Sequence, residues 1–318
     1  MELYNWIPTT CSPDRHPIKV LAGDFEFLNE PKVLIPCSNI CNNGWGEIGL
    51  VNLTENDFHA IPYRIDITWF SLVENKFYKG DFVLPEQKIR QLFSEGFKNP
   101  ANDENTTYEF IIAGMAPNGL VAVWAAGHGI VTELCFFQAG ETNIEWGKLN
   151  DNPSDTRQAY VERKLKLALK DEDILLLKEN AELNREWHKY HIRYHWTPIC
   201  LGNIEPVNLW LFSSNGECEF IRFNTNTPKH SQLRSGMRKL IFRWRGVSGK
   251  RFVSYIYFDL QEVMAIFQKL YSYDAEATYQ LQIEFNSVSN LVELFLASNT
   301  FFYEFVKCNA KIYTETSP

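Results

Sequence analysis

The stretch YRIDITWF, residues 63–70, decides the fold class because apolar and polar side chains alternate along it. Its two isoleucines and Trp69 fall on one side of an extended chain, which is the period of a strand with one buried face. A turn leads into a second predicted strand over 76–84, and Pro85 then opens a helix at a first-turn position. A hairpin followed by a helix indicates an α+β fold with antiparallel sheets, not a parallel strand–helix–strand sheet.

The predicted helix is followed by three further strands. Ile89, Leu92 and Phe93 form an apolar stripe at spacings of three and four, and Gly96 marks the end of the helix. The later strands are predicted over 108–115, 120–126 and 130–139, with the turn APNG at 116–119 between the first two.

The same order of elements returns in the second half of the chain. Strands are predicted over 207–212, 217–223, 237–245 and 250–258, then a helix capped by Asp259, then strands over 279–285, 291–296 and 301–306. At an offset of 175 residues Trp69 falls on Trp244 and Phe77 on Phe252; at 174 Phe93 falls on Phe267, and at 171 Phe110 falls on Leu281. This constancy indicates two diverged copies of one strand–strand–helix–strand–strand–strand unit, although any two such stretches would align in pattern.

The segment between the two blocks is dense in charge and predicts two helices, one over about 156–170 and one starting at Asp171. We therefore expect a first α+β unit over 1–150, a helical connector over 151–197 and a second α+β unit over 198–318.

Composition bounds the class of protein. Of the 318 residues 45% are hydrophobic and 22% charged, which is enough apolar material for a sizeable core. The net charge of -8 argues against a general nucleic-acid binder and permits a basic protein partner.

The compartment is expected to be the cytoplasm. The seven cysteines are odd in number and widely spaced, unlike a disulfide framework. The first residues contain no basic start and apolar run, so we expect neither a signal peptide nor a lipoprotein leader in this chain. No apolar window is long enough to predict a membrane span.

Few residues suggest chemistry. On one helix His188, His191 and His195 would share a face, as a metal site requires, but no acid or cysteine follows them closely. We therefore favour a packed aromatic and basic segment. Cys37 and Cys41 alone are a weak metal signal.

Two further candidates for chemistry also have simpler explanations. Cys135 lies on a predicted strand, where it is expected to be a small buried hydrophobe. The glycine-rich stretch 114–119 joins two strands and leads into no helix N-terminus that could bind phosphate. We predict no catalytic residue, metal or cofactor, and hence a protein that is not an enzyme.

The second block contains a basic hairpin. Alternation places Arg243 and Arg245 on the strand face opposite Phe242 and Trp244, as either a solvated face or a site for an acidic partner. We expect a partner to bind where the two blocks differ, and the candidate residues are Asp171, Glu172, Asp173, Arg243 and Arg245.

The chain resembles a bacterial family catalogued as domain of unknown function 2931. The resemblance is carried by the stretches Ile65–Ser71, Lys76–Gly80, Leu92–Gly96, Gly114–Gly119 and Arg193–Trp196, among others. His191 departs from it, because family members often have an arginine before the Arg-Tyr pair.

The resemblance implies a family without an established catalytic activity. Its members are often lipoproteins, and some look like immunity proteins encoded beside toxins of type VI secretion systems. It therefore implies a protein that binds and neutralises a cognate toxin. The alternative is a small-ligand binder or an uncharacterised enzyme with a site between the two units.

Overall fold

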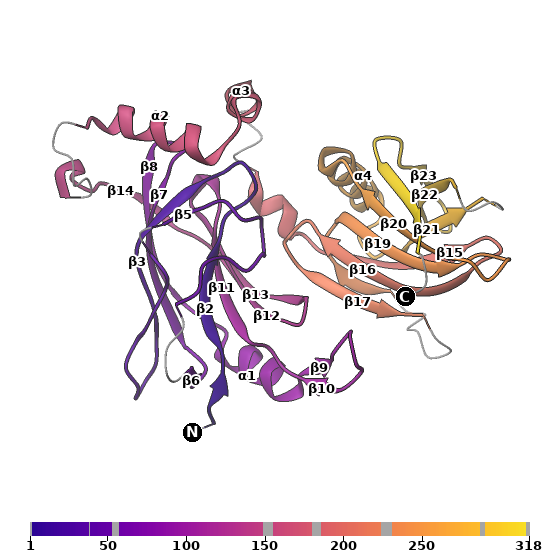
Figure 1. The fold of residues 1–318 in the computed structure, drawn as a ribbon, viewed down its shortest axis with the longest axis horizontal. Helices are drawn as coiled ribbons and strands as arrows, with labels where there is room; N and C mark the ends of the chain where they lie inside the picture. Colours follow the sequence, from indigo (N-terminus) through magenta and orange to yellow (C-terminus); the bar gives the residue numbers. More distant parts are fainter. Residues whose placement is uncertain are drawn as a thin grey trace. The chain divides into compact units, whose positions relative to one another are not determined.

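The computed structural model describes residues 2–37, 39–52, 57–148, 155–179, 186–223, 231–286 and 290–315. The chain forms two compact units, residues 1–187 (unit 1) and 188–318 (unit 2) (Figure 1). The division falls inside the stretch 151–197 that was predicted to be a separate connector. Each unit is described by itself.

Unit 1 contains two sheets. The first has the order β2 (Ile7–Cys11), β11 (Phe110–Met115), β12 (Leu120–Gly127) and β13 (Ile130–Gln138). The second has the order β14 (Gly140–Thr142), β8 (Lys76–Val83), β7 (Arg64–Ser71), β3 (Ile18–Glu26) and β4 (Val33–Leu34), and β5 (Ile40–Cys41) also pairs with β3. Unit 1 also contains two separate strand pairs, β1 (Tyr4–Asn5) with β6 (Phe58–His59) and β9 (Phe97–Lys98) with β10 (Asn105–Thr106).

The core of unit 1 lies between these two sheets. The inner faces of β7 and β3 pack against those of β11 and β12, and α1 (Glu86–Glu95) adds Ile89 and Phe93. Gly96 ends α1 at a φ of 60°, where a side chain would collide with the carbonyl oxygen of Thr106. The helix therefore stops where the sequence predicted.

Two more helices follow in unit 1, α2 (Arg157–Ala168) and α3 (Asp171–Glu179). Tyr160 and Val161 of α2 pack on Phe70 and Phe77 of β7 and β8, so α2 covers part of the outer face of that sheet (Figure 1).

Unit 2 also contains two sheets. The first has the order β18 (Gln232–Arg234), β15 (Tyr194–Leu201), β21 (Tyr279–Phe285), β22 (Val292–Ala297) and β23 (Phe302–Glu304). The second has the order β17 (Cys218–Arg222), β16 (Glu205–Ser213), β19 (Met237–Arg245), β20 (Arg251–Tyr257) and β24 (Asn309–Thr314). Helix α4 (Leu260–Tyr273) buries Val263, Ile266, Phe267 and Leu270 against the core between the sheets.

The α+β class is confirmed, but each unit has one parallel pair that was not predicted. In unit 1 β2 runs parallel to β11, and in unit 2 β15 runs parallel to β21. The chain leaves the first sheet after β2, builds the second sheet and α1, and then returns. A long crossover of this kind is what parallel pairing requires.

The inner-face tryptophans occupy matching places in the two units. Trp69 stacks on Tyr78 with ring centroids 5.2 Å apart, and Trp244 stacks on Phe252 at 5.4 Å. In the strand registers Trp69 lies opposite Tyr78, and Trp244 lies opposite Phe252. Tyr78 and not Phe77 therefore corresponds to Phe252. The predicted alignment was wrong by one residue because the second hairpin is one residue shorter.

A second alignment was also wrong by one residue. Phe110 was predicted to match Leu281, but Phe110 packs on the outer face of its sheet, whereas Ile111 and Leu281 both belong to the buried cores. Ile111 lies opposite Pro8, and Leu281 lies opposite Pro198. Ile111 and not Phe110 therefore corresponds to Leu281.

The first strand region of each unit contains a motif that sequence alignment missed. The stretches YNWIP (4–8) and YHWTP (194–198) share Tyr-x-Trp-x-Pro. The indole nitrogen of Trp6 donates to the carbonyl oxygen of Ala60 at 3.2 Å, and that of Trp196 donates to the carbonyl oxygen of Ser235 at 3.1 Å. Both tryptophans are fully buried, and each ties the start of its strand region to the backbone of a segment outside any strand.

The cap of α4 gives a test of the fold. The Asp259 carboxylate accepts a hydrogen bond from the backbone nitrogen of Glu262 at 2.8 Å. We expect Asp259→Ala to lower the free energy of unfolding by about 1 kcal/mol in urea titrations. Asp259→Asn keeps a capping acceptor and is expected to change it little, so equal losses in both variants would contradict this role.

Candidate functional site

The predicted acidic residues lie at the start of α3. Asp171 and Glu172 are exposed, and the Asp173 carboxylate pairs with the Arg15 guanidinium at 2.7 Å. Acidic groups in a first helical turn interact favourably with the helix dipole, so a local role accounts for the three acids.

The predicted basic residues lie in unit 2, on the outer face of β19. Arg243 pairs with Glu315 at 2.8 Å, and Arg245 pairs with Glu205 at 2.9 Å. Their neighbours Phe242 and Trp244 are buried on the inner face. Both arginines therefore have carboxylate partners within unit 2, and neither acts alone on this surface.

The outer face of this sheet carries more than the two arginines. Strand registers place its side chains in three rows across the five strands: Cys218, Phe212, Lys239, Tyr257 and Asn309; Phe220, Trp210, Ile241, Tyr255 and Lys311; Arg222, Asn208, Arg243, Val253 and Tyr313. We call these three rows the aromatic–basic face. Its described residues include no Asp or Glu.

Aromatic rings and cations are interleaved on the aromatic–basic face. Trp210 packs on Phe220 with ring centroids 4.8 Å apart. The Lys239 ammonium lies 4.9 Å from the ring centroid of Phe212 and 5.4 Å from that of Tyr257. Tyr257 is 45% exposed and Tyr313 is 52% exposed. The face thus offers large apolar groups and positive charge to solvent.

The matching sheet of unit 1 serves as an internal control. Trp210, Ile241 and Tyr255 lie opposite one another on adjacent strands of unit 2. In unit 1 the same places in the strand order are occupied by Asp24, Asp66 and Asp81.

These carboxylates of unit 1 belong to ion pairs. Asp24 pairs with Lys32 at 3.1 Å and Asp66 with Lys79 at 3.7 Å, and Asp81 pairs with Arg64. A face built in this way is suited to water. The equivalent places of unit 2 hold Trp, Ile and Tyr, which are the side chains of an apolar contact surface.

Charge is divided unevenly between the units. Residues 188–318 contain 14 Lys and Arg against 11 Asp and Glu, whereas residues 1–187 contain 17 against 28. Unit 2 therefore has a net positive charge, although the whole chain has a net negative charge.

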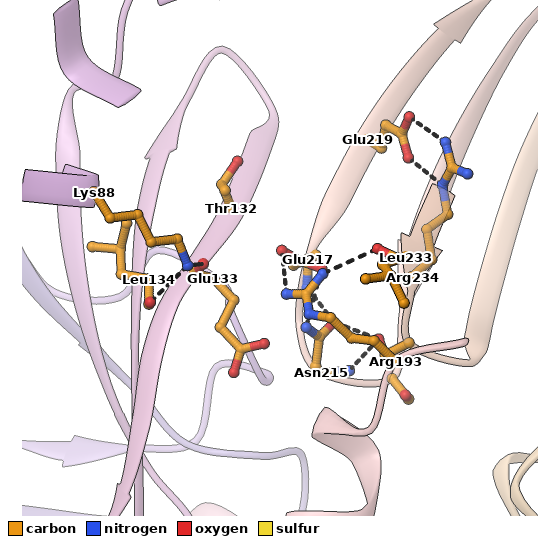
Figure 2. Close-up of polar contacts among 12 residues, drawn as sticks. Lys88, Thr132, Glu133, Leu134, Arg193, Asn215, Glu217, Glu219, Leu233 and Arg234 are labelled. Atoms are coloured by element: carbon orange, nitrogen blue, oxygen red, sulfur yellow. Dashed lines mark hydrogen bonds and ion pairs between the residues drawn. The ribbon is translucent and has the colours of Figure 1, made fainter. Parts of the chain in front are cut away.

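Two arginines, one of them buried, contact the hairpin of β16 and β17 (Figure 2). Arg234, only 7% exposed, donates to both carboxylate oxygens of Glu219 at 2.7 and 2.8 Å and to the carbonyl oxygen of Trp196 at 2.9 Å. Arg193 donates to Glu217 at 2.9 Å. The Arg234 bonds join β18 to β17 and β15, so the strand that carries Phe220 is held by charge-assisted hydrogen bonds.

Unit 1 contains a comparable lysine contact. The Lys88 ammonium donates to the carbonyl oxygens of Glu133 and Leu134 at 2.9 and 2.8 Å, which ties α1 to β13 (Figure 2).

The three histidines of the predicted helix face do not share a helix. His188 and His191 lie in a short 3-10 turn over Trp187–His191, whereas His195 lies on β15. Among the described residues no group of three His, Cys, Asp or Glu side chains is placed to hold a metal ion.

Cys11 and Cys218 are buried, and four further cysteines are half-buried. Burial raises the pKa of Cys11 well above its usual value, and burial raises the pKa of both Cys135 and Cys200 to about 12. A thiol with a raised pKa stays protonated at neutral pH and is a poor nucleophile. Cys37 is exposed.

Described residues line a pocket in each unit. One of about 100 Å³ lies in unit 1 beside the Asn/Gly loop and is lined by Thr10, Cys37, Cys41 and Asn43, among others. Another of about 280 Å³ lies in unit 2 between β22 and β24. Ligand pockets usually measure about 300–1,000 Å³, so the larger of these is only marginal for a small molecule. None of the described helices is long and apolar enough to cross a membrane.

Of the two predicted arginines, Arg243 belongs to the aromatic–basic face and Arg245 lies beyond its last row, and the prediction missed the aromatic residues. Strand alternation in 207–212 and 250–258 already places Trp210 with Phe212 and Tyr255 with Tyr257. The hairpin of β19 and β20 was predicted, but local spacing could not show that β16 pairs with the other side of β19, and β24 with Tyr313 was not predicted at all.

The burial of the thiols predicts their order of alkylation. With iodoacetamide at about pH 8, Cys37 should be modified first in the folded chain, because only a very small fraction of Cys135 and Cys200 is thiolate there. Mass spectrometry of peptides checks the order, with a urea-unfolded sample as control. Early modification of Cys135 or Cys200 in the folded chain would contradict the placement of these thiols.

Comparison with known proteins identifies the family and nothing further. Searches of curated proteins and of solved structures gave no significant match. The family model described as "Protein of unknown function (DUF2931)" matches residues 1–175, which is more than half of the chain. The chain therefore belongs to the DUF2931 family.

Proposed function

We propose that this chain is a protein-binding protein and not an enzyme, and that its partner docks on the aromatic–basic face of unit 2. In line with the family resemblance, the partner is a bacterial toxin, and the chain is the immunity protein that neutralises it in the cytoplasm. The observation that carries the docking proposal is the contrast between the units. Equivalent outer-face positions hold Asp24, Asp66 and Asp81 in unit 1 but Trp210, Ile241 and Tyr255 in unit 2.

We also infer that the two units are diverged copies of one unit. Both pair their strands in the same order, and both have a one-residue bulge just after the strand partner of the inner tryptophan, Trp69 or Trp244. Shared insertions of this kind are conserved features of related sheets. A duplication leaves one copy free to acquire a new surface while the other keeps the ancestral one.

The chemistry of the aromatic–basic face favours a protein partner. Tyr, Trp, Phe and Arg are the residues enriched at protein interfaces, where a few of them contribute most of the affinity. A broad sheet face offers the large contact area that a protein partner requires. The cations Lys239 and Lys311 suit an acidic surface on the toxin.

The test exchanges the residues of the two units. Ile241→Asp places the unit 1 residue in the aromatic–basic face, and Asp66→Ile makes the reverse change in unit 1 as a matched control. The partner is the product of the gene adjacent to the one that encodes this chain, and affinity is measured by calorimetry. We expect Ile241→Asp to weaken binding about 30-fold, because a charge replaces a buried apolar contact, and Asp66→Ile to leave it unchanged.

The same variants are expected to differ in protection of cells that express the toxin. Circular dichroism must show both variants folded, and Trp210→Ala provides a second disruption without a new charge. Wild-type affinity in both Ile241→Asp and Trp210→Ala would contradict the proposal that the partner docks on the aromatic–basic face. Failure of the wild-type chain to bind or protect against the adjacent gene product would sink the immunity role itself.

A further inference from the structure

The last long strand of unit 1 fills a corner between the two sheets. β13 stays paired with β12 to the end of that strand, with Phe137 opposite Val121 and Gln138 opposite Leu120. The Phe137 ring stacks on Phe82 of β8 with centroids 4.6 Å apart and planes 2° from parallel. A strand and its aromatic side chain thus close this corner.

The corresponding strand of unit 2 stops early. β23 pairs only with the end of β22, from Phe295 to Ala297, and the last bond between them runs from the Phe305 nitrogen to the Leu294 oxygen at 2.9 Å. The chain then turns away and becomes β24 on the other sheet. No described strand pairs with Leu291–Glu293 on this side.

The edge left open presents backbone groups. The peptide groups of alternate residues in a strand point to the same side, so those of Val292 face the open edge as those of Leu294 do. An unpaired edge of this kind is a template for another strand.

The aromatic side chain that closes the corner in unit 1 is also missing. Glu141 lies opposite Tyr78 in unit 1, and Thr314 lies opposite Phe252 in unit 2. Glu141 and Thr314 therefore hold equivalent places in the two units. The residue four positions earlier is Phe137 in unit 1 and Ala310 in unit 2, so Ala310 stands where unit 1 has Phe137. The pocket of about 280 Å³ lies here, lined by Phe252, Leu291, Val292, Ala310 and Ile312 among others.

We infer that unit 2 accepts an extended strand of the partner protein along Val292, with an aromatic side chain of that strand in the pocket beside Ala310. The inference rests on the proposed function, because the occupant is part of the protein partner. Unit 1 shows the contacts that such a strand would make. Its own strand β13 pairs with β12 and places Phe137 against Phe82. Strand addition of this kind gives affinity through the backbone and specificity through alternate side chains.

The strand site is continuous with the aromatic–basic face. Tyr313 belongs to that face and also lines the pocket. One partner can therefore engage both, with an acidic surface on the face and an extended segment at the edge.

The test uses the strand of unit 1 as the probe. A fluorescein-labelled peptide of residues 132–142, with serine in place of Cys135, is titrated against the full chain and followed by fluorescence anisotropy. We expect saturable binding by the wild-type chain, and no binding of the same peptide with Phe137→Asp. Ala310→Trp in the chain fills the pocket and should weaken binding at least tenfold.

Controls separate this inference from the docking surface. Ala101→Trp, at an exposed position of unit 1, should bind the peptide like wild type. Ile241→Asp should do so as well, so a failure of the peptide to bind would overturn the strand site and leave the face proposal standing. Hydrogen exchange should show the Val292 amide becoming protected when the peptide binds.

Other outcomes overturn the inference in defined ways. Unchanged affinity in folded Ala310→Trp would remove the pocket, and binding without protection of Val292 would remove the strand pairing. A concentration-dependent dimer of the full chain that Ala310→Trp abolishes would assign the site to a second copy instead of a partner protein.

Discussion

The burial of one face of every sheet is the constraint on which the rest of the structure depends. In each unit the two sheets enclose a single core, and the inner faces hold tryptophan, phenylalanine and branched aliphatic residues. Trp69 with Tyr78 and Trp244 with Phe252 show how closely these positions are kept, since both pairs stack at nearly the same distance. Tightly packed interiors tolerate few changes of volume or shape. Differences between the units are therefore concentrated on outer faces and at edges.

The outer faces and edges of the two units differ in the kind of side chain that they carry. Unit 1 keeps carboxylates and their cationic partners on the outer face of one sheet, and α2 covers part of that face. Unit 2 has aromatic and basic side chains at the equivalent positions, a shorter β23 and an open corner beside Ala310. The family model matches residues 1–175, so the features proposed to bind a partner lie outside the matched part.

Local periodicity was sufficient to predict much of this fold. Strands β7, β19 and β21, the Asp259 cap of α4 and the two-block order follow from alternation, spacing and turn residues. The parallel pairs could not be predicted, because β2 and β11 are separated by about a hundred residues and local spacing does not determine which strands meet. The aromatic–basic face was missed for the same reason. Trp210 and Tyr255 are unremarkable on single strands and form a surface only when β19 lies between them.

The most direct measurement is hydrogen–deuterium exchange of the full chain with and without the product of the adjacent gene. A docked partner shields backbone amides of the strands it covers and of the edge it completes. The account predicts new protection in β19, β20 and β24 and at Leu291–Glu293, with little change in β7 and β8. Protection confined to residues 1–175, with unit 2 unchanged, would contradict it.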